Sequence, residues 1–166
     1  MKIINKVMII VLILISNITI GQNGTTQDKN IFTKIELLVR HSRKIIDKEV
    51  HITIFNRPEP KKSEIFVWTT DADKETSVKP DFRIKISKDE YSQIEKLIHS
   101  IDIDSFVKFE NRIGVDGYEC QLTYGDSMSS ISLNAWSPSS NTEERQLQTY
   151  LKVCNMILKA AKKEEL

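Results

Sequence analysis

The stretch that most constrains the fold covers residues 116–138, DGYECQLTYGDSMSSISLNAWSP. Apolar and polar residues alternate on both sides of a polar centre, and this is the period of a half-buried β-strand. Residues 125–128 supply the glycine and polar side chains of a four-residue turn. The segment therefore predicts a β-hairpin that ends at Trp136 and Pro138.

The register of this hairpin follows from its apolar positions. If Tyr124 faces Ser129, then Leu122 faces Ile131 and every apolar side chain of the two strands lies on one face. A slip of one residue would destroy this match. The opposite face is then predicted to carry Glu119, Gln121, Thr123, Ser130, Ser132, Asn134 and Trp136.

Four further strands are predicted before the hairpin. Residues 50–54 and 82–86 alternate in the same way. Residues 64–70 form an apolar run rich in β-branched and aromatic residues, which indicates a central strand with both faces partly covered and with Trp68 in the core. Residues 31–39 fit a helix or a strand, and we favour a strand because residues 50–54 need a neighbour.

Two amphipathic helices are also predicted. Ser87 and Glu90 have the spacing of a capping box at the start of the first helix, and apolar residues recur at helical spacing as far as Ile101. The second helix follows Pro138, with the acidic residues 143–144 in its first turn. We expect Leu151 and Leu158 of this helix to be buried against the sheet. The whole apolar stripe consists of Leu147, Tyr150, Leu151, Cys154, Ile157, Leu158 and Ala161.

This succession of elements predicts an α+β fold. About six strands, mostly joined by short polar turns, favour a mainly antiparallel sheet with the two helices packed on one face. Residues 102–109 are expected to contain a short extended piece. The chain has 166 residues, of which 40% are hydrophobic and 28% charged, and this fits one domain over residues 31–166.

Residues 1–21 predict a secretory signal peptide. Lys2 and Lys6 precede an unbroken apolar run at 7–15, and small residues follow near the expected cleavage site. An uncleaved anchor is the alternative, but the run is shorter than the about 20 residues that span a bilayer. Residues 22–30 contain no apolar side chain and predict a flexible lead-in. We therefore expect an exported bacterial protein, periplasmic or extracellular, with no membrane attachment after cleavage.

The charge balance is close to neutral. Removal of Lys2 and Lys6 with the leader reduces the 24 basic residues to 22, against 23 acidic residues. This balance gives no electrostatic basis for binding nucleic acid or an anionic membrane surface.

No short motif indicates catalysis, a metal or a cofactor. His41, His51 and His99 are scattered without metal-ligand spacing. The acidic runs at 71–75 and 102–104 lack the glycine and the distant glutamate of a calcium loop. The sequence also contains no GxSxG, P-loop or dinucleotide fingerprint. We therefore expect no cofactor and favour a role without catalysis.

The two cysteines leave two interpretations open. Cys120 falls on the apolar face of the hairpin and Cys154 on the apolar stripe of the last helix, so the two side chains could meet. They could form a disulfide, which an oxidising compartment permits. They could instead be buried thiols that pack as small apolar side chains. The separation of their Cα atoms would decide.

The polar hairpin face is the candidate partner-binding surface. An aromatic ring among polar and charged groups suits a protein or glycan partner. In the alternative interpretation, Trp136 closes the end of the core or packs under residues 137–141. The candidate residues are Trp136, Glu119, Gln121, Asn134 and, from the preceding loop, Arg112.

These observations favour an exported binding module of the inhibitor or immunity type, whose partner is another secreted or envelope protein. A secreted enzyme with a site assembled from distant residues and an envelope-associated structural protein are the alternatives. A deep pocket with two ionisable groups within hydrogen-bond distance would favour the enzyme. An exposed apolar patch around Trp136 would favour binding. The sequence leaves the oligomeric state open.

Overall fold

The computed structural model describes residues 33–57, 63–74, 79–109, 114–126 and 128–166. The predicted signal peptide, the lead-in and Arg112 lie outside the described residues. One compact unit extends from Phe32 to Leu166. Its elements are β1 (Lys34–His41), β2 (Glu49–Phe55), β3 (Ser63–Thr70), β4 (Phe82–Ile86), α2 (Lys88–His99), α3 (Ile103–Phe109), β5 (Tyr118–Gly125), β6 (Ser130–Trp136) and α4 (Gln148–Ala160).

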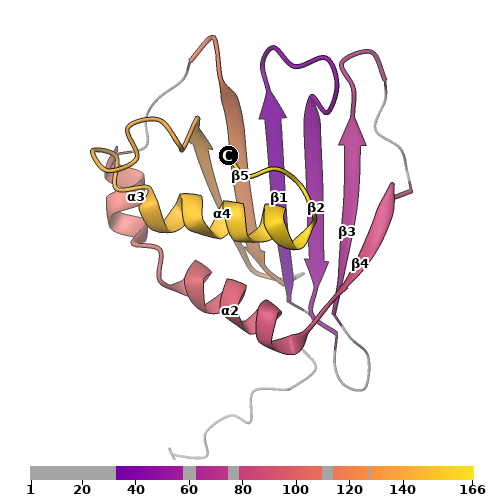
Figure 1. Cartoon of the computed structure of the whole chain (residues 1–166). Helices are drawn as coiled ribbons and strands as arrows, with labels where there is room; N and C mark the ends of the chain where they lie inside the picture. The colour runs from indigo at the N-terminus through magenta and orange to yellow at the C-terminus, as the bar shows by residue number, and fades with distance from the viewer. Residues whose placement is uncertain (1–32, 58–62, 75–78, 110–113, 127) are drawn as a thin grey trace, which may run out of the picture. The chain divides into compact units, whose positions relative to one another are not determined.

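The strands form one six-stranded antiparallel sheet in the order β4-β3-β2-β1-β5-β6 (Figure 1). β1 is an inner strand that pairs with β2 on one side and with β5 on the other. The predicted α+β fold with an antiparallel sheet is confirmed. Residues 34–39 of the ambiguous segment belong to β1, in which the alternate residues Ile35, Leu37 and Val39 all enter the core.

The predicted β5–β6 hairpin is confirmed, but its predicted register is wrong by two residues. Leu122 faces Leu133 instead of Ile131. The turn begins one residue later than expected, since the N–H of Asp126 donates to the carbonyl of Ser129 at 2.8 Å. The Asp126 carboxylate also accepts two backbone N–H groups of the turn, at 2.7 and 2.8 Å. A turn displaced by one residue moves the register by two, so the apolar side chains keep their face.

The capping box at the start of α2 is confirmed. The Ser87 hydroxyl accepts the N–H of Glu90 at 3.2 Å, and the Glu90 carboxylate accepts the N–H of Ser87 at 3.0 Å. The helix buries one apolar side, formed by Tyr91, Ile94 and Ile98.

The expectation of an extended piece in residues 102–109 is wrong, because this segment forms the helix α3. The Asp102 carboxylate accepts the N–H and the hydroxyl of Ser105 at 3.2 and 2.7 Å, which satisfies donors at the helix start. The ring of Phe106 then packs on the ring of Tyr150 in α4, with their centroids 5.0 Å apart. Burial of this one ring fixes the short helix against the core.

The last helix begins later than predicted. Residues 139–147 lie before α4, so the acidic residues 143–144 are not in its first turn. Asn141 and Gln146 have φ angles of 53° and 54°, which a continuous right-handed helix does not contain.

A buried cation holds this irregular segment. Arg145 is only 3% exposed, and its guanidinium group donates three hydrogen bonds of 2.7 to 2.9 Å to backbone carbonyls. The segment therefore curls around the guanidinium group and does not extend the helix. The accepting carbonyls are those of Trp136, Ser137 and Ser140.

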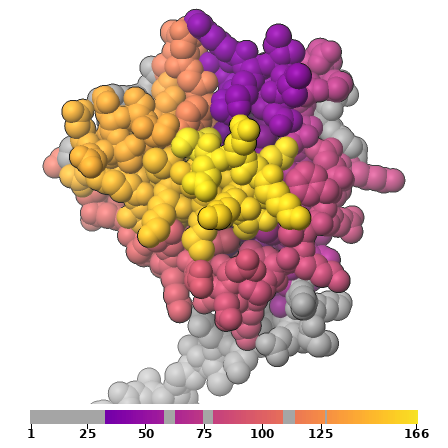
Figure 2. All heavy atoms as spheres, viewed as in Figure 1, coloured from indigo at the N-terminus to yellow at the C-terminus, as the bar shows by residue number. Residues whose placement is uncertain are grey.

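Helix α4 contacts the sheet at the hairpin. The buried hydroxyl of Tyr150 lies 2.5 Å from the carbonyl of Cys120 and 3.3 Å from that of Leu133. Figure 1 shows α2 and α4 in front of the sheet, and the atoms of α4 cover the middle of the view in Figure 2. Leu158 is buried as predicted, whereas the predicted burial of Leu151 is wrong, because Leu151 lies at the helix flank and is half-buried.

Two truncations on α4 test this packing. Ile157 is fully buried, so Ile157→Ala should lower the free energy of unfolding by about 2 to 5 kcal/mol. Leu151→Ala, on the same helix, should lower the free energy of unfolding by less than about 2 kcal/mol, because the half-buried Leu151 side chain removes less apolar surface from water on folding. Urea denaturation followed by circular dichroism measures both values. Equal costs would contradict the packing of α4.

Candidate binding surface on the sheet

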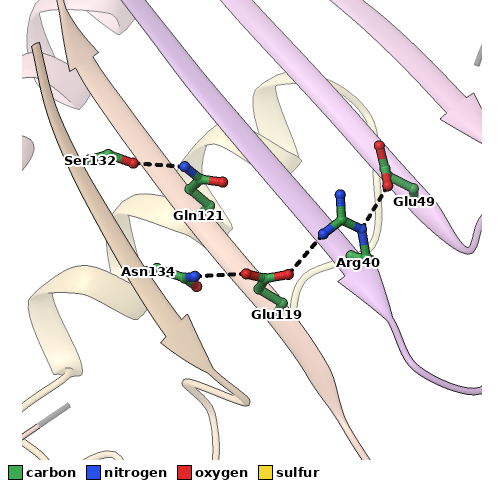
Figure 3. A network of polar contacts seen from close by, with 6 residues as sticks. All are labelled: Arg40, Glu49, Glu119, Gln121, Ser132 and Asn134. Atoms are coloured by element: carbon green, nitrogen blue, oxygen red, sulfur yellow. Dashed lines mark hydrogen bonds and ion pairs between the residues drawn. The ribbon is translucent and has the colours of Figure 1, made fainter. Parts of the chain in front are cut away.

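The outer face of the sheet consists of the strand side chains that alternate with the buried ones. On β1 it comprises Glu36, Leu38 and Arg40, which are half-buried or exposed. Figure 3 shows this face with α4 behind the strands. The outer face is therefore the side of the sheet turned away from α4.

Arg40 is the centre of a polar network on this face (Figure 3). Its Nε donates to Glu49 of β2 at 2.8 Å, and its Nη1 donates to Glu119 of β5 at 3.0 Å. Hydrogen bonding to Glu49, and then the charges of both carboxylates, raise the pKa of the Arg40 guanidinium group. One cation thus joins three adjacent strands, with its donors in the fork geometry that suits carboxylates.

Three of the predicted site residues belong to this surface. Asn134 donates from Nδ2 to Glu119 at 2.7 Å, which extends the Arg40 network to β6. Gln121 donates from Nε2 to the hydroxyl of Ser132 at 2.8 Å. These cross-strand bonds fix the side chains in one arrangement, although each one remains partly open to solvent.

Trp136 lies apart from the centre of this network. Its indole ring lies close to the backbone of Gly114 and Gly117. A Cβ atom at Gly114 would collide with the indole ring, and one at Gly117 would collide with Ser137 Oγ and lie 3.1 Å from the indole Nε1. The ring is half-buried against this segment. The glycines at 114 and 117 are required here because only a residue without a side chain permits this approach.

The prediction that Trp68 lies in the core is wrong. Its ring is on the outer face between two other rings, 5.2 Å from His51 and 6.2 Å from Phe66 by centroid distance. Phe66 contacts Phe55 edge-on at 5.3 Å and carries the guanidinium group of Arg83 at 5.0 Å. These rings form an aromatic row, defined as Phe55, Phe66, Trp68 and His51.

The sequence contained a signal for the aromatic row that the prediction did not use. Residues 64, 66 and 68 alternate with the apolar Ile65 and Val67. In the structure Phe66 pairs with Thr53 and Trp68 pairs with His51, on the outer side of β2. The continuous apolar run of β3 hid this alternation. The candidate surface therefore extends from the hairpin over the middle of the sheet.

The charges beside the aromatic row are also paired. Glu36 lies 3.7 Å from Nε2 of His51 and 2.9 Å from the ammonium group of Lys34. Contact with His51, and then with Lys34, outweighs burial and lowers the pKa of Glu36 to about 2. Glu36 is therefore an anion at every pH at which the protein would normally be studied.

One cluster of titratable groups lies outside the outer face. The hydroxyl of Tyr124 donates to Glu95 of α2 at 2.8 Å and lies 3.2 Å from Nε2 of His99. Burial, and then the Glu95 carboxylate, raise the pKa of Tyr124. A phenol with a raised pKa is a weaker acid and stays protonated near neutral pH, so it supplies no phenolate there and these contacts favour a structural role.

A cavity of about 330 Å³ lies where the end of α4 meets β1 and β2. Its apolar wall includes Leu158, and its rim carries Lys163 and Asp47, whose charged groups are 3.5 Å apart. Burial, and then the charge of Lys44, lower the pKa of His41 at the same cavity. Lys163 and Asp47 are paired with each other here, and a partly exposed ion pair of this kind is common as a structural contact.

The two cysteines are free thiols that meet in the core. Both are fully buried, and their Sγ atoms are 3.4 Å apart. Burial and the neighbouring Cys120 raise the pKa of the Cys154 thiol, so it is not an activated nucleophile.

Metal binding and membrane insertion find no support in the described ranges. The residues that the structure describes include no group of three or more His, Cys, Asp or Glu side chains able to hold a metal ion. In the same part of the chain, no helix is both long and apolar enough to cross a bilayer.

The burial of the thiols gives a labelling prediction. A thiol reagent should modify neither Cys120 nor Cys154 in the native protein, because both are shielded from solvent. After unfolding in guanidinium chloride, two thiols per chain should react. Rapid labelling of the native chain would contradict the burial, and no reaction after unfolding would show that the pair forms a disulfide.

Glu36 gives a prediction of pH dependence. Its folded-state pKa of about 2 is below the ordinary 4.5, so its stabilisation is present above pH 4.5 and is lost as the pH falls towards 2. Glu36→Gln should lower the free energy of unfolding by about 1 kcal/mol at pH 7 after allowance for solvent screening, and by less at lower pH. Denaturation curves of wild type, Glu36→Gln and the control Glu165→Gln, an exposed residue, measure this. A pH-independent difference would contradict the assignment.

Comparison with known proteins does not assign the chain to a family. No protein-family model matches the sequence, and no curated protein is found as a relative.

Proposed function

We propose that this chain is a non-catalytic binding module that uses the outer face of its sheet to bind another protein. The observation that carries the proposal is the position of the aromatic row beside the Arg40 network, on the side of the sheet turned away from α4. Tryptophan and arginine are the residues most enriched among those that dominate protein–protein binding energy.

The chemistry of this surface indicates what the partner offers. Trp68 and Phe66 supply half-buried apolar area, which a partner completes with an apolar side chain. Arg83 lies over the ring of Phe66, where its remaining donors suit a carboxylate. The expected partner surface is therefore an apolar centre with an acidic group at its edge.

The hydrogen bonds of the outer face also support binding without rearrangement. Arg40, Glu49, Glu119 and Asn134 are already tied together across four strands. Side chains held in place before binding lose little conformational freedom when a partner arrives. This favours a rigid docking surface over a segment that folds on binding.

The sequence supports the class of partner. The signal peptide expected at residues 1–21 supports a location in the envelope or outside the cell. A small exported domain that binds one partner and catalyses nothing has the role of an inhibitor or an immunity protein. The partner is then another secreted or envelope protein.

Partner capture with matched variants tests this proposal. Immobilised wild type should enrich a specific protein from the exported fraction of its own cells, and the purified pair should form a complex. Trp68→Ala should weaken the complex by about 30-fold or more, the effect of a residue at the centre of an interface. Arg83→Ala should weaken it to a smaller extent.

The control for these variants is Met128→Ala. Met128 is 92% exposed in the β5–β6 turn, away from the aromatic row, so its truncation should leave affinity within about twofold. Circular dichroism confirms that each variant is folded. Equal binding by wild type and Trp68→Ala, or no specific partner, would contradict the proposal.

A further inference from the structure

The sheet has two edge strands, and they differ in their protection. The order of strands places β4 at one edge and β6 at the other. An edge strand presents unpaired N–H and C=O groups to which another strand can add. Charged side chains are one of the features by which proteins block such addition. β4 carries Arg83 and Lys85, both exposed, whereas β6 contains no charged residue and no proline.

The register shows which backbone groups of β6 face the free edge. Ser137 donates its N–H to Tyr118 at 2.7 Å, and the Asp126 N–H donates to Ser129 at 2.8 Å. Both bonds join directly opposite residues, and in an antiparallel pair every second opposite pair is hydrogen-bonded. The odd-numbered residues of β6, which lie between Ser129 and Ser137 at steps of two, are therefore the ones that exchange hydrogen bonds with β5. The alternate residues, Ser130, Ser132 and Asn134, direct their backbone groups away from β5.

The free part of this edge has definite limits. All three alternate residues are exposed, and within the described residues no hydrogen bond to their backbone groups occurs outside the strand ladder. At the far end, the carbonyl of Trp136 accepts a bond from Arg145 and is no longer available. The open segment is therefore residues 130–134.

A second observation concerns the apolar side of the same strand. Ile131 is 56% exposed although it faces the same side as the buried Leu133. Ile131 is exposed on the core side because, in the described part of the chain, no strand lies beyond β6 in the sheet to contact it. The strand is therefore incomplete both in hydrogen bonding and in apolar contact.

We propose that β6 pairs with β6 of a second copy of this chain, antiparallel, about a two-fold axis at Ser132. Ser132 then faces the partner's Ser132, and Ser130 faces the partner's Asn134. In this register the three residues with free backbone groups pair with one another. Ile131 faces the partner's Leu133, which covers its exposed side chain.

The absence of charge on β6 favours a second copy as the occupant. Two-fold pairing places a strand opposite its own copy, so the charges of a charged strand meet like charges of that copy. Pairing of β4 with itself would bring Arg83 and Lys85 of one copy close to the same two cations of the other. β6 brings together only serine, asparagine and apolar side chains. This inference rests on the backbone groups of the β6 edge, whereas the test of the proposed function rests on Trp68 and Arg83, so either one can fail without the other.

Sedimentation equilibrium of the mature chain tests the dimer. The mass should double over the range from about 1 to about 100 µM, the affinity expected of a modest interface. Ser132→Lys places two like charges directly opposite at the axis and should weaken dimerisation by at least about tenfold. Met128→Lys adds the same charge in the nearby turn and should leave dimerisation unchanged.

Hydrogen exchange of the wild-type protein provides a test without mutation. The amides of Ser130, Ser132 and Asn134 should become more protected as concentration rises. Those of Ile131 and Leu133, already bonded to β5, should not change. A monomer throughout this range, or a dimer unaffected by Ser132→Lys, would overturn the proposal. Addition of a different protein's strand to monomeric chain would also overturn it.

Discussion

The strict alternation of side chains along β1 is the constraint on which the rest of the structure depends. β1 lies between β2 and β5, and its buried residues are Ile35, Leu37 and Val39. The side of the sheet that these residues occupy is therefore also the hydrophobic side of β2 and of β5. The same alternation directs Glu36 and Arg40 outward. Because Arg40 belongs to an inner strand, it reaches a carboxylate on each neighbour. The core and the candidate surface are therefore two results of one pattern.

Short-period patterns predicted much of this fold, because one buried face imposes them on the sequence. The four strands before the hairpin, the hairpin itself and the capping box at Ser87 were found in this way. The patterns failed where single contacts decide the backbone. The Asp126 carboxylate sets the turn, the burial of Phe106 accompanies α3, and the buried Arg145 delays α4. No periodicity reports such contacts in advance.

The candidate site was predicted only in part, for a related reason. Glu119, Gln121 and Asn134 were assigned to one face by parity, and the structure places all three on the outer face. Arg40 and Trp68 were missed because their neighbours come from distant segments, β1 with β5 and β2 with β3. The alternation of residues along a strand shows on which face of that strand a residue lies. It does not give the order of strands, and that order determines which residues meet.

The position of β1 also has a consequence for the order in which the chain folds. β1 can pair with β2 through a short connection, but its pairing with β5 joins Lys34 to Gly125 across most of the domain. Closing so long a loop costs conformational entropy before any contact is gained, and such topologies fold slowly. The two halves of the sheet are thus expected to form first, as β1 to β4 and as the β5–β6 hairpin. Until they join, both β1 and β5 are open edges, and this is the state in which a chaperone would have most to protect.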